Sequence, residues 1–209
     1  MIDPRNWRCE HGHSGLEHPV CWQRDQPQKI GYLDIEASNL DADFGFVLSW
    51  CIKHADMNKY DGYVLRRRDY RTVDRDKEAI RRLIPALSQF DTIVTYYGHD
   101  WQFDMPFLRA RALKYGFQFL PYKSVIHIDL YRSAKSKFKL HSGRLDAAAD
   151  FFGLGEKTKI KGDMWVKANA KFDKKALNYI WKHNKIDCDI LERLHKLLMP
   201  YIRVTRRSI

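Results

Sequence analysis

The chain has 209 residues, with 37 Lys and Arg against 26 Asp and Glu, and a formal net charge of +11. This length suits one domain with its own core, and four cysteines are too few for a disulfide scaffold. No apolar run is long enough to cross a membrane, which excludes a membrane-spanning class. The start, with Asp3 and Pro4, lacks the apolar core of a signal peptide, so we expect a cytoplasmic protein. A basic field of this size attracts phosphate backbones, so nucleic acid is the expected partner, and nothing indicates a membrane or a particular protein partner.

Residues 1–27 are predicted to be an extension ahead of the first strand, rich in Cys and His. Five metal-binding side chains fall within thirteen residues of it: Cys9, His11, His13, His18 and Cys21. Four of the five suffice for one tetrahedral, structural Zn²⁺, with both cysteines as thiolates and two of the three histidines completing the set. Two alternatives are a leader in which histidines fall together by chance and a disulfide between the two cysteines.

Residues 28–209 are predicted to form the main domain. In chain order we expect strands near 29–37, 45–54 and 61–66, a helix near 74–90, a strand at 92–97, a helix at 105–115, a strand at 125–131, and helices near 144–152, 173–183 and 185–198. Three strands joined by short turns, followed by strands that alternate with helices, predict an α/β fold. The expected sheet is five-stranded and mixed, with helices on both faces.

The first predicted strand carries two carboxylates, Asp34 and Glu36. Because side chains alternate along a strand, these two share one face, while Leu33 and Ile35 pack on the other. Two neighbouring anions on a buried strand need a positive charge to compensate them, and a divalent cation supplies it. The alternative is an edge strand with a polar face.

A third carboxylate, Asp104, follows the strand predicted at 92–97 and opens the next helix. Its plain alternative role is that of a helix cap, because Asp favours that position and Pro106 suits a first helical turn.

The last predicted helical stretch places His183 and Asp187 four residues apart within an apolar stripe. Residues at this spacing lie side by side on a helix, and a buried unpaired acid is rare. The alternatives are a salt bridge or cap for Asp187, and a core histidine bonded to its neighbour for His183.

Several basic runs are candidate phosphate contacts, although each alone is typical of a solvated face. They include Arg109, Arg111 and Lys114 on one predicted helix and Lys157, Lys159 and Lys161 before Trp165. Lys157, Trp165 and Arg109 are the predicted substrate-binding residues, with Trp165 available to stack on a base. Core packing is the alternative for Trp165.

Taken together, three segments resemble the exonuclease motifs of the DEDD superfamily, of ribonuclease-H-like fold. The segments are Asp34-x-Glu36, Phe103-Asp104-x-Pro106-Phe107-Leu108 and His183-Asn184-x-x-Asp187, within a resemblance that spans about residues 29 to 200. The nearest branches are the proofreading domains of family B DNA polymerases and stand-alone phage and bacterial nucleases.

The resemblance implies a metal-dependent 3′→5′ exonuclease acting on single-stranded DNA or frayed 3′ ends. Its metal ligands would be Asp34, Glu36, Asp104 and Asp187, holding two Mg²⁺ or Mn²⁺ ions, the cations that oxygen ligands favour. This chain departs from the nearest branch at His183, where that branch usually has tyrosine. We expect His183 to orient the attacking water or to act as general base.

Two other functions stay open at this point. The same site could belong to a ribonuclease or a structure-selective endonuclease, because discrimination between sugars depends on pocket shape. A non-catalytic nucleic-acid-binding module of a replication or repair assembly is the second, although four clustered anions would hinder a protein that only bound phosphate.

Overall fold

The fold was analysed in a computed structural model, which describes residues 5–18, 21–22, 28–99, 102–121, 124–155 and 161–202. Its sheet has five strands in the order β3-β2-β1-β4-β5. The strands are β1 (Ile30–Ala37), β2 (Val47–His54), β3 (Tyr60–Val64), β4 (Thr92–Thr95) and β5 (Ile126–Asp129). β1, β2 and β3 pair antiparallel, whereas β4 pairs parallel with both β1 and β5. The predicted five-stranded mixed sheet is therefore confirmed.

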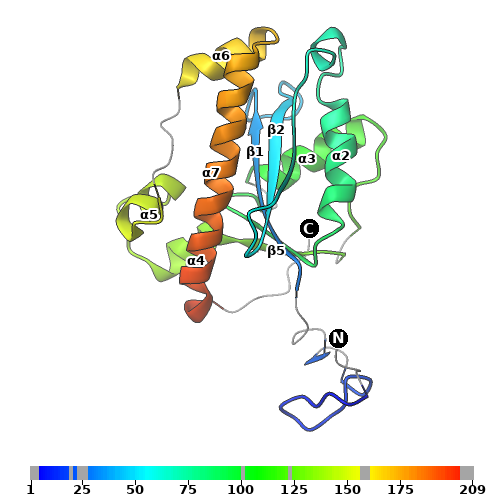
Figure 1. The fold of residues 1–209 in the computed structure, drawn as a ribbon, viewed down its shortest axis with the longest axis vertical. Coiled ribbons are helices and arrows are strands. Elements are labelled where there is room, and N and C mark those ends of the chain that lie inside the picture. The colour runs from blue at the N-terminus through cyan, green and yellow to red at the C-terminus, as the bar shows by residue number, and fades with distance from the viewer. Residues whose placement is uncertain are drawn as a thin grey trace.

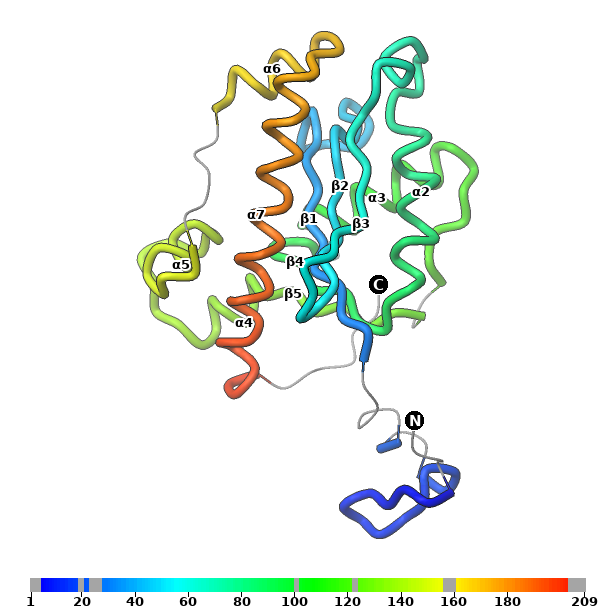
Figure 2. The backbone as a smooth tube through the Cα atoms, in the orientation of Figure 1, coloured from blue at the N-terminus to red at the C-terminus, as the bar shows by residue number. Residues whose placement is uncertain are grey.

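Helices cover both faces of this sheet, as predicted (Figure 1). The described helices are α2 (Lys77–Leu87), α3 (Asp104–Lys114), α4 (Leu130–Lys137), α5 (Leu145–Phe152), α6 (Gly162–Ala170) and α7 (Lys174–Leu198), with 3₁₀ turns at Asp69–Arg71 and Met199–Tyr201. α2 and α3 lie on one face, and the long α7 crosses the other (Figure 2). α4, α5 and α6 all contact α7.

The alternation of β1 decides which side chains face which helix layer. Leu33 and Ile35 are buried in the core shared with α2 and α3. Tyr32 is buried in the second core, with α4, α5 and α7. Because neighbours along a strand point to opposite faces, Asp34 and Glu36 lie on the α7 side, where both are half-buried.

Three helix predictions were wrong. The helices expected at 173–183 and 185–198 form one continuous helix, α7, because neither glycine nor proline interrupts the stretch and Asn184 is itself buried against the sheet. α4 was missed: the carboxylate of Asp129 accepts a hydrogen bond from the Tyr131 N–H at 2.9 Å and caps a helix where a strand was expected to continue. α6 was missed because its few apolar residues give a weak helical pattern.

The expectation that Arg111 contacts nucleic acid is also wrong. Arg111 is buried, and its guanidinium donates to both carboxylate oxygens of the fully buried Asp76, at 2.9 and 2.6 Å. Asp76 also accepts from the Val47 N–H at 2.9 Å. This pair ties α3 and the start of α2 to β2, on the face of the sheet opposite α7.

None of the helices that the structure describes is long and apolar enough to cross a membrane.

Candidate active site

Three elements bring the predicted acidic residues together. Asp34 and Glu36 project from β1, Asp104 is the first residue of α3, and Asp187 lies in the middle of α7. Asp34 and Asp187 line one open pocket of about 450 Å³. Burial leaves Asp104 and Asp187 only 5% and 4% exposed. Asp34, Glu36 and Asp187 therefore meet on the α7 side of the sheet, and the charge of Asp34 reaches Asp104 at the start of α3.

His183 lies between two of the carboxylates. Its Nε2 atom is 3.7 Å from Glu36 Oε1 and 3.7 Å from Asp187 Oδ2. One ligand atom from each of these three residues lies within 4.8 Å of the others, which is close enough to share one metal ion. His183 is buried, so its ring is held within the site by α7 packing.

Asp104 does not cap its helix. The cap position of α3 is occupied by Phe103, and no side-chain capping bond forms there. Burial, together with the charges of Asp34 and Asp129, holds the pKa of Asp104 well above its usual value, partly offset by hydrogen bonds from its own backbone and from that of Ile35. A bound cation would relieve the repulsion that acts on Asp104, so the donor set fits a divalent metal.

Gly98 allows the chain to pass directly against this carboxylate. A Cβ atom at Gly98 would lie 2.7 Å from Asp104 Oδ2, closer than real Cβ contacts. A side chain at position 98 would therefore displace Asp104.

The family of this chain follows from comparison with known proteins. The family model of the RNase_H superfamily matches residues 31–199, which include every element from β1 to α7. The chain belongs to the RNase_H superfamily. The ribonuclease-H-like fold inferred from the three motifs is thus confirmed.

This RNase_H-superfamily chain is similar in sequence to one archaeal DNA polymerase and in fold to another, in line with the resemblance seen in the motifs. The chain is 30% identical over 156 residues to a DNA polymerase of Methanocaldococcus jannaschii, an alignment that covers 65% of this chain and 9% of the polymerase. A structure of the family B DNA polymerase from the hyperthermophilic archaeon Pyrobaculum calidifontis matches with a TM-score of 0.66 and 20% identity. That match covers 84% of this chain and 25% of the polymerase chain. The chain therefore spans only a minor part of the length of either polymerase.

Asn184 is a site residue to which sequence reasoning gave no role. Its side-chain N–H donates to Asp34 Oδ2 at 2.5 Å, and its oxygen accepts from the Ser49 hydroxyl. Asn184 is fully buried, so it fixes the rotamer of Asp34 from α7. Its place between His183 and Asp187 in the third motif was the signal that could have found it.

Trp165 reaches the site from α6. Its indole N–H donates to Glu36 Oε2 at 3.0 Å, and its ring meets the His183 ring edge-on with centroids 5.6 Å apart. The structure thus gives Trp165 a contact with the acidic cluster, while stacking on a nucleotide stays a prediction.

The other two predicted substrate contacts lie elsewhere. The Arg109 guanidinium sits 5.9 Å over the Phe119 ring, and Arg109 is not among the residues that line the pocket. Lys157 falls outside the described residues. Both roles stay predictions.

Six further residues line the same pocket, and none of them is predicted from the sequence to bind substrate: Tyr96, Tyr97, Tyr131, Gly143, Arg144 and Leu145. Tyr97 is 48% exposed, and its ring meets Tyr131 edge-on at 4.8 Å between centroids. Arg144 is exposed and pairs with Asp146 at 3.2 Å. Exposed aromatic rings and a cation beside carboxylates suit a nucleic-acid strand end.

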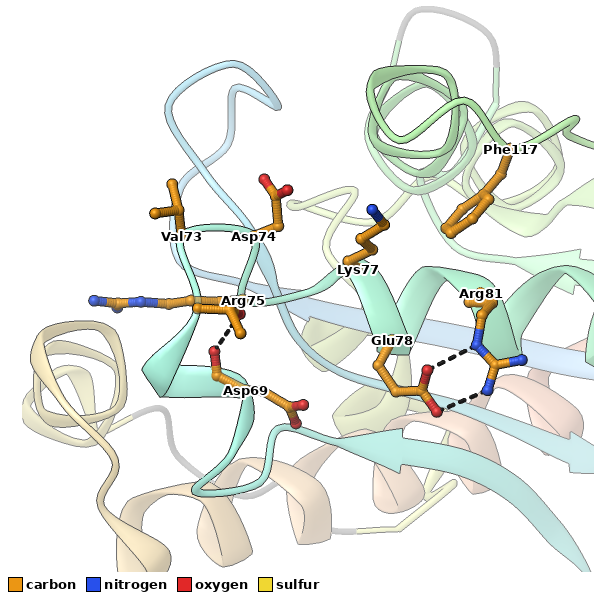
Figure 3. Close-up of a pocket in the computed structure, with 9 residues that line it drawn as sticks. Asp69, Val73, Asp74, Arg75, Lys77, Glu78, Arg81 and Phe117 are labelled. Atoms are coloured by element: carbon orange, nitrogen blue, oxygen red, sulfur yellow. Dashed lines mark hydrogen bonds and ion pairs between the residues drawn. The ribbon is translucent and has the colours of Figure 1, made fainter.

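A second hollow, of about 500 Å³, lies near the start of α2 and is lined by Glu78, Arg81 and Phe117, among others (Figure 3). There Glu78 accepts two hydrogen bonds from Arg81, at 2.7 and 2.9 Å. Those bonds, with Arg82, lower the pKa of Glu78 to about 2. The metal-ligating groups found among the described residues contain no side chain of this hollow. Asp187 belongs to such a group and lines the α7-side pocket, which is therefore the candidate active site.

Proposed function

We propose that this RNase_H-superfamily chain is a divalent-metal-dependent 3′→5′ exonuclease that hydrolyses phosphodiester bonds of single-stranded DNA or of frayed 3′ ends. The observation that carries the proposal is the convergence of carboxylates from three elements: Asp34 and Asp187 line one pocket, Glu36 and Asp187 lie in one metal-ligating group, and Asp104 feels the charge of Asp34. Membership of the superfamily and similarity to DNA polymerases support a nuclease-type activity.

The site chemistry favours Mg²⁺ or Mn²⁺. Its donors are carboxylate oxygens with one imidazole, and hard oxygen donors select hard cations. Asp34, Glu36, Asp104 and Asp187 would hold two ions. When bound, such ions supply the positive charge that activates a water molecule and stabilises the leaving oxygen.

The protein's own residues would orient the reactants. Asn184 and Trp165 hold Asp34 and Glu36 in place by hydrogen bonds at 2.5 and 3.0 Å. His183, between two carboxylates, is positioned to orient the attacking water or to accept its proton. The +11 net charge draws the phosphate backbone toward the protein despite the acidic site.

The deciding experiment is a time course on 5′-labelled single-stranded DNA and RNA of one sequence, each with Mg²⁺, Mn²⁺ or EDTA. We expect a ladder that shortens from the 3′ end with either metal, none with EDTA, and faster shortening of DNA than of RNA. A 3′-terminal phosphorothioate serves as control and should delay the first product.

Each other outcome selects a different function. Internal cuts at the earliest time points would show that the chain is an endonuclease. Faster cleavage of RNA than of DNA would show that it is a ribonuclease. Salt-sensitive binding without cleavage in any metal would make the chain a binding module.

A substitution at Trp165 separates positioning of Glu36 from stacking on substrate. Trp165→Phe keeps an aromatic ring but removes the N–H that Glu36 accepts. A hydrogen bond to a charged group is worth about 1.5–3 kcal/mol, so we expect kcat to fall about tenfold or more, with KM changed little.

The matched control is Trp181→Phe on α7, whose ring lies against Gly62 of β3 and not in the site. It should leave kcat within about twofold, because the Trp181 ring packs on the sheet and none of its contacts among the described residues reaches the acidic cluster. A Trp165→Phe protein with normal kcat and raised KM would instead assign the residue to substrate stacking.

A further inference from the structure

The N-terminal segment contains a second group of metal-ligating side chains, apart from the acidic site. In Figure 1 this segment extends away from the sheet and its helices. We propose that Cys9, His11, His18 and Cys21 form a tetrahedral Zn²⁺ site that holds the segment folded. One ligand atom from each of the four lies within 4.8 Å of the others.

The interatomic distances match a tetrahedral zinc centre. Zn–S bonds of about 2.3 Å and Zn–N bonds of about 2.0–2.1 Å place sulfur and nitrogen roughly 3.6 Å apart across a tetrahedron. Cys9 Sγ lies 3.7 Å from His11 Nδ1 and 3.6 Å from His18 Nδ1. Cys21 Sγ lies 3.8 Å from His11 Nδ1. A thiol carries one proton and can serve only one of two imidazoles, whereas a shared cation serves all four donors.

The backbone builds this arrangement from two short structures. A turn formed by the Gly12 N–H and the Cys9 carbonyl, 2.8 Å apart, brings Cys9 and His11 together, and Gly12 takes the φ of +81° that the turn needs. A helical turn over residues 14–18 follows, in which the Ser14 carbonyl accepts from the His18 N–H at 2.9 Å. The His18 carbonyl in turn accepts from the Cys21 N–H at 3.1 Å, which keeps Cys21 close to His18.

The start of the helical turn is fixed by Glu17. Its carboxylate accepts from the N–H and the hydroxyl of Ser14, at 2.8 and 2.7 Å. These bonds lower the pKa of Glu17 and keep it ionised. Glu17 is therefore occupied with the backbone, and the ligands come from the Cys and His side chains alone.

Burial shows why the segment needs a metal. Cys9 and Cys21 are 6% and 5% exposed, and neither forms a disulfide. Trp7 and Trp22 form an edge-on pair with ring centroids 5.5 Å apart. A unit of this size cannot bury enough apolar surface to fold, and such units normally require a metal or disulfides.

The same geometry sets His13 apart from the ligands. Its backbone carbonyl accepts from the Cys9 N–H at 3.0 Å, while its side chain lies outside the group of four. Of the three histidines that the sequence offered, His11 and His18 are thus assigned. Two thiolates and two imidazoles prefer Zn²⁺, whereas the acidic site prefers harder cations, so the two sites take different metals.

The test uses the full chain, purified under reducing conditions and dialysed against excess Mg²⁺. We expect about one zinc per chain by elemental analysis in the wild-type protein and in His13→Asn, and near-zero zinc in Cys9→Ser and His18→Asn. Asp187→Asn is the control for the acidic site and should keep its zinc. Cobalt substitution should give thiolate-to-metal charge-transfer absorption in the wild type and in Asp187→Asn, because both proteins keep Cys9 and Cys21.

Alkylation gives a readout that is independent of nuclease activity. Zinc-bound thiolates react slowly with an alkylating reagent. Removing the zinc with a chelator should therefore raise the number of rapidly alkylated cysteines by two, and mass spectrometry should identify these as Cys9 and Cys21. Zinc retained at wild-type level in Cys9→Ser, zinc lost in Asp187→Asn, or a Cys9–Cys21 disulfide in the freshly purified protein would each overturn the proposal.

Discussion

Asp34→Asn is expected to lower phosphodiester cleavage by about 10²-fold or more while leaving the fold intact. One preorganised charged group at a reacting centre is commonly worth this much. Asparagine has nearly the shape of aspartate, so it fills the same space beside Asn184. Removing the charge also relieves its repulsion of Asp104, whose pKa it helps to raise. In the absence of metal, the folded state of Asp34→Asn should therefore be at least as stable as that of the wild type.

The effect is measured as kcat/KM with Mg²⁺ on single-stranded DNA, together with thermal unfolding with and without Mg²⁺. Mg²⁺ should raise the Tm of the wild type more than that of Asp34→Asn, because a ligand that binds the folded state more tightly stabilises it more at the same concentration. Asp150→Asn, an exposed carboxylate on α5, is the matched control and should behave as wild type. Equal cleavage by Asp34→Asn and Asp150→Asn would remove Asp34 from the site.

The largest stability effect is expected from Asp76→Ala. The side chains of Asp76 and Arg111 are 0% and 4% exposed, and they are joined by two hydrogen bonds at 2.9 and 2.6 Å. Removing one partner of a buried ion pair leaves an uncompensated charge, which typically costs about 3–5 kcal/mol. Here it also removes the acceptor for the Val47 N–H, so α2, α3 and β2 would all loosen.

Urea unfolding of Asp76→Ala gives the free energy directly. Glu78→Ala is the comparison, because Glu78 pairs with Arg81 and Arg82 at the surface, where ion pairs contribute about 1 kcal/mol or less. The double variant Asp76→Leu with Arg111→Met should recover most of the loss, since no buried charge remains. A cost for Asp76→Ala no greater than that for Glu78→Ala would show that the pair is not a structural link.

Some of the site is predictable because it depends on local periodicity. The two-residue period of a strand places Asp34 and Glu36 on one face, and their half-burial on the α7 side agrees with it. The helical period places His183 beside Asp187, and the structure has them 3.7 Å apart. The mixed sheet with helices on both faces followed from the succession of elements, because parallel pairing requires crossovers.

Other features depend on contacts between residues far apart in the chain. The bonds from Asn184 to Asp34 and from Trp165 to Glu36 span 150 and 129 residues, and neither periodicity nor propensity encodes such a partner. The choice of His11 and His18 over His13 depends on a turn and a helical turn meeting. The sequence predicts Arg111 to be a surface cation, whereas the structure buries it, because Asp76 compensates its charge. The periodicity of the sequence determines which residues share one face of a strand or helix. The packing of those faces then selects the partner of each buried polar group, because such a group is stable only where a hydrogen-bonding partner reaches it.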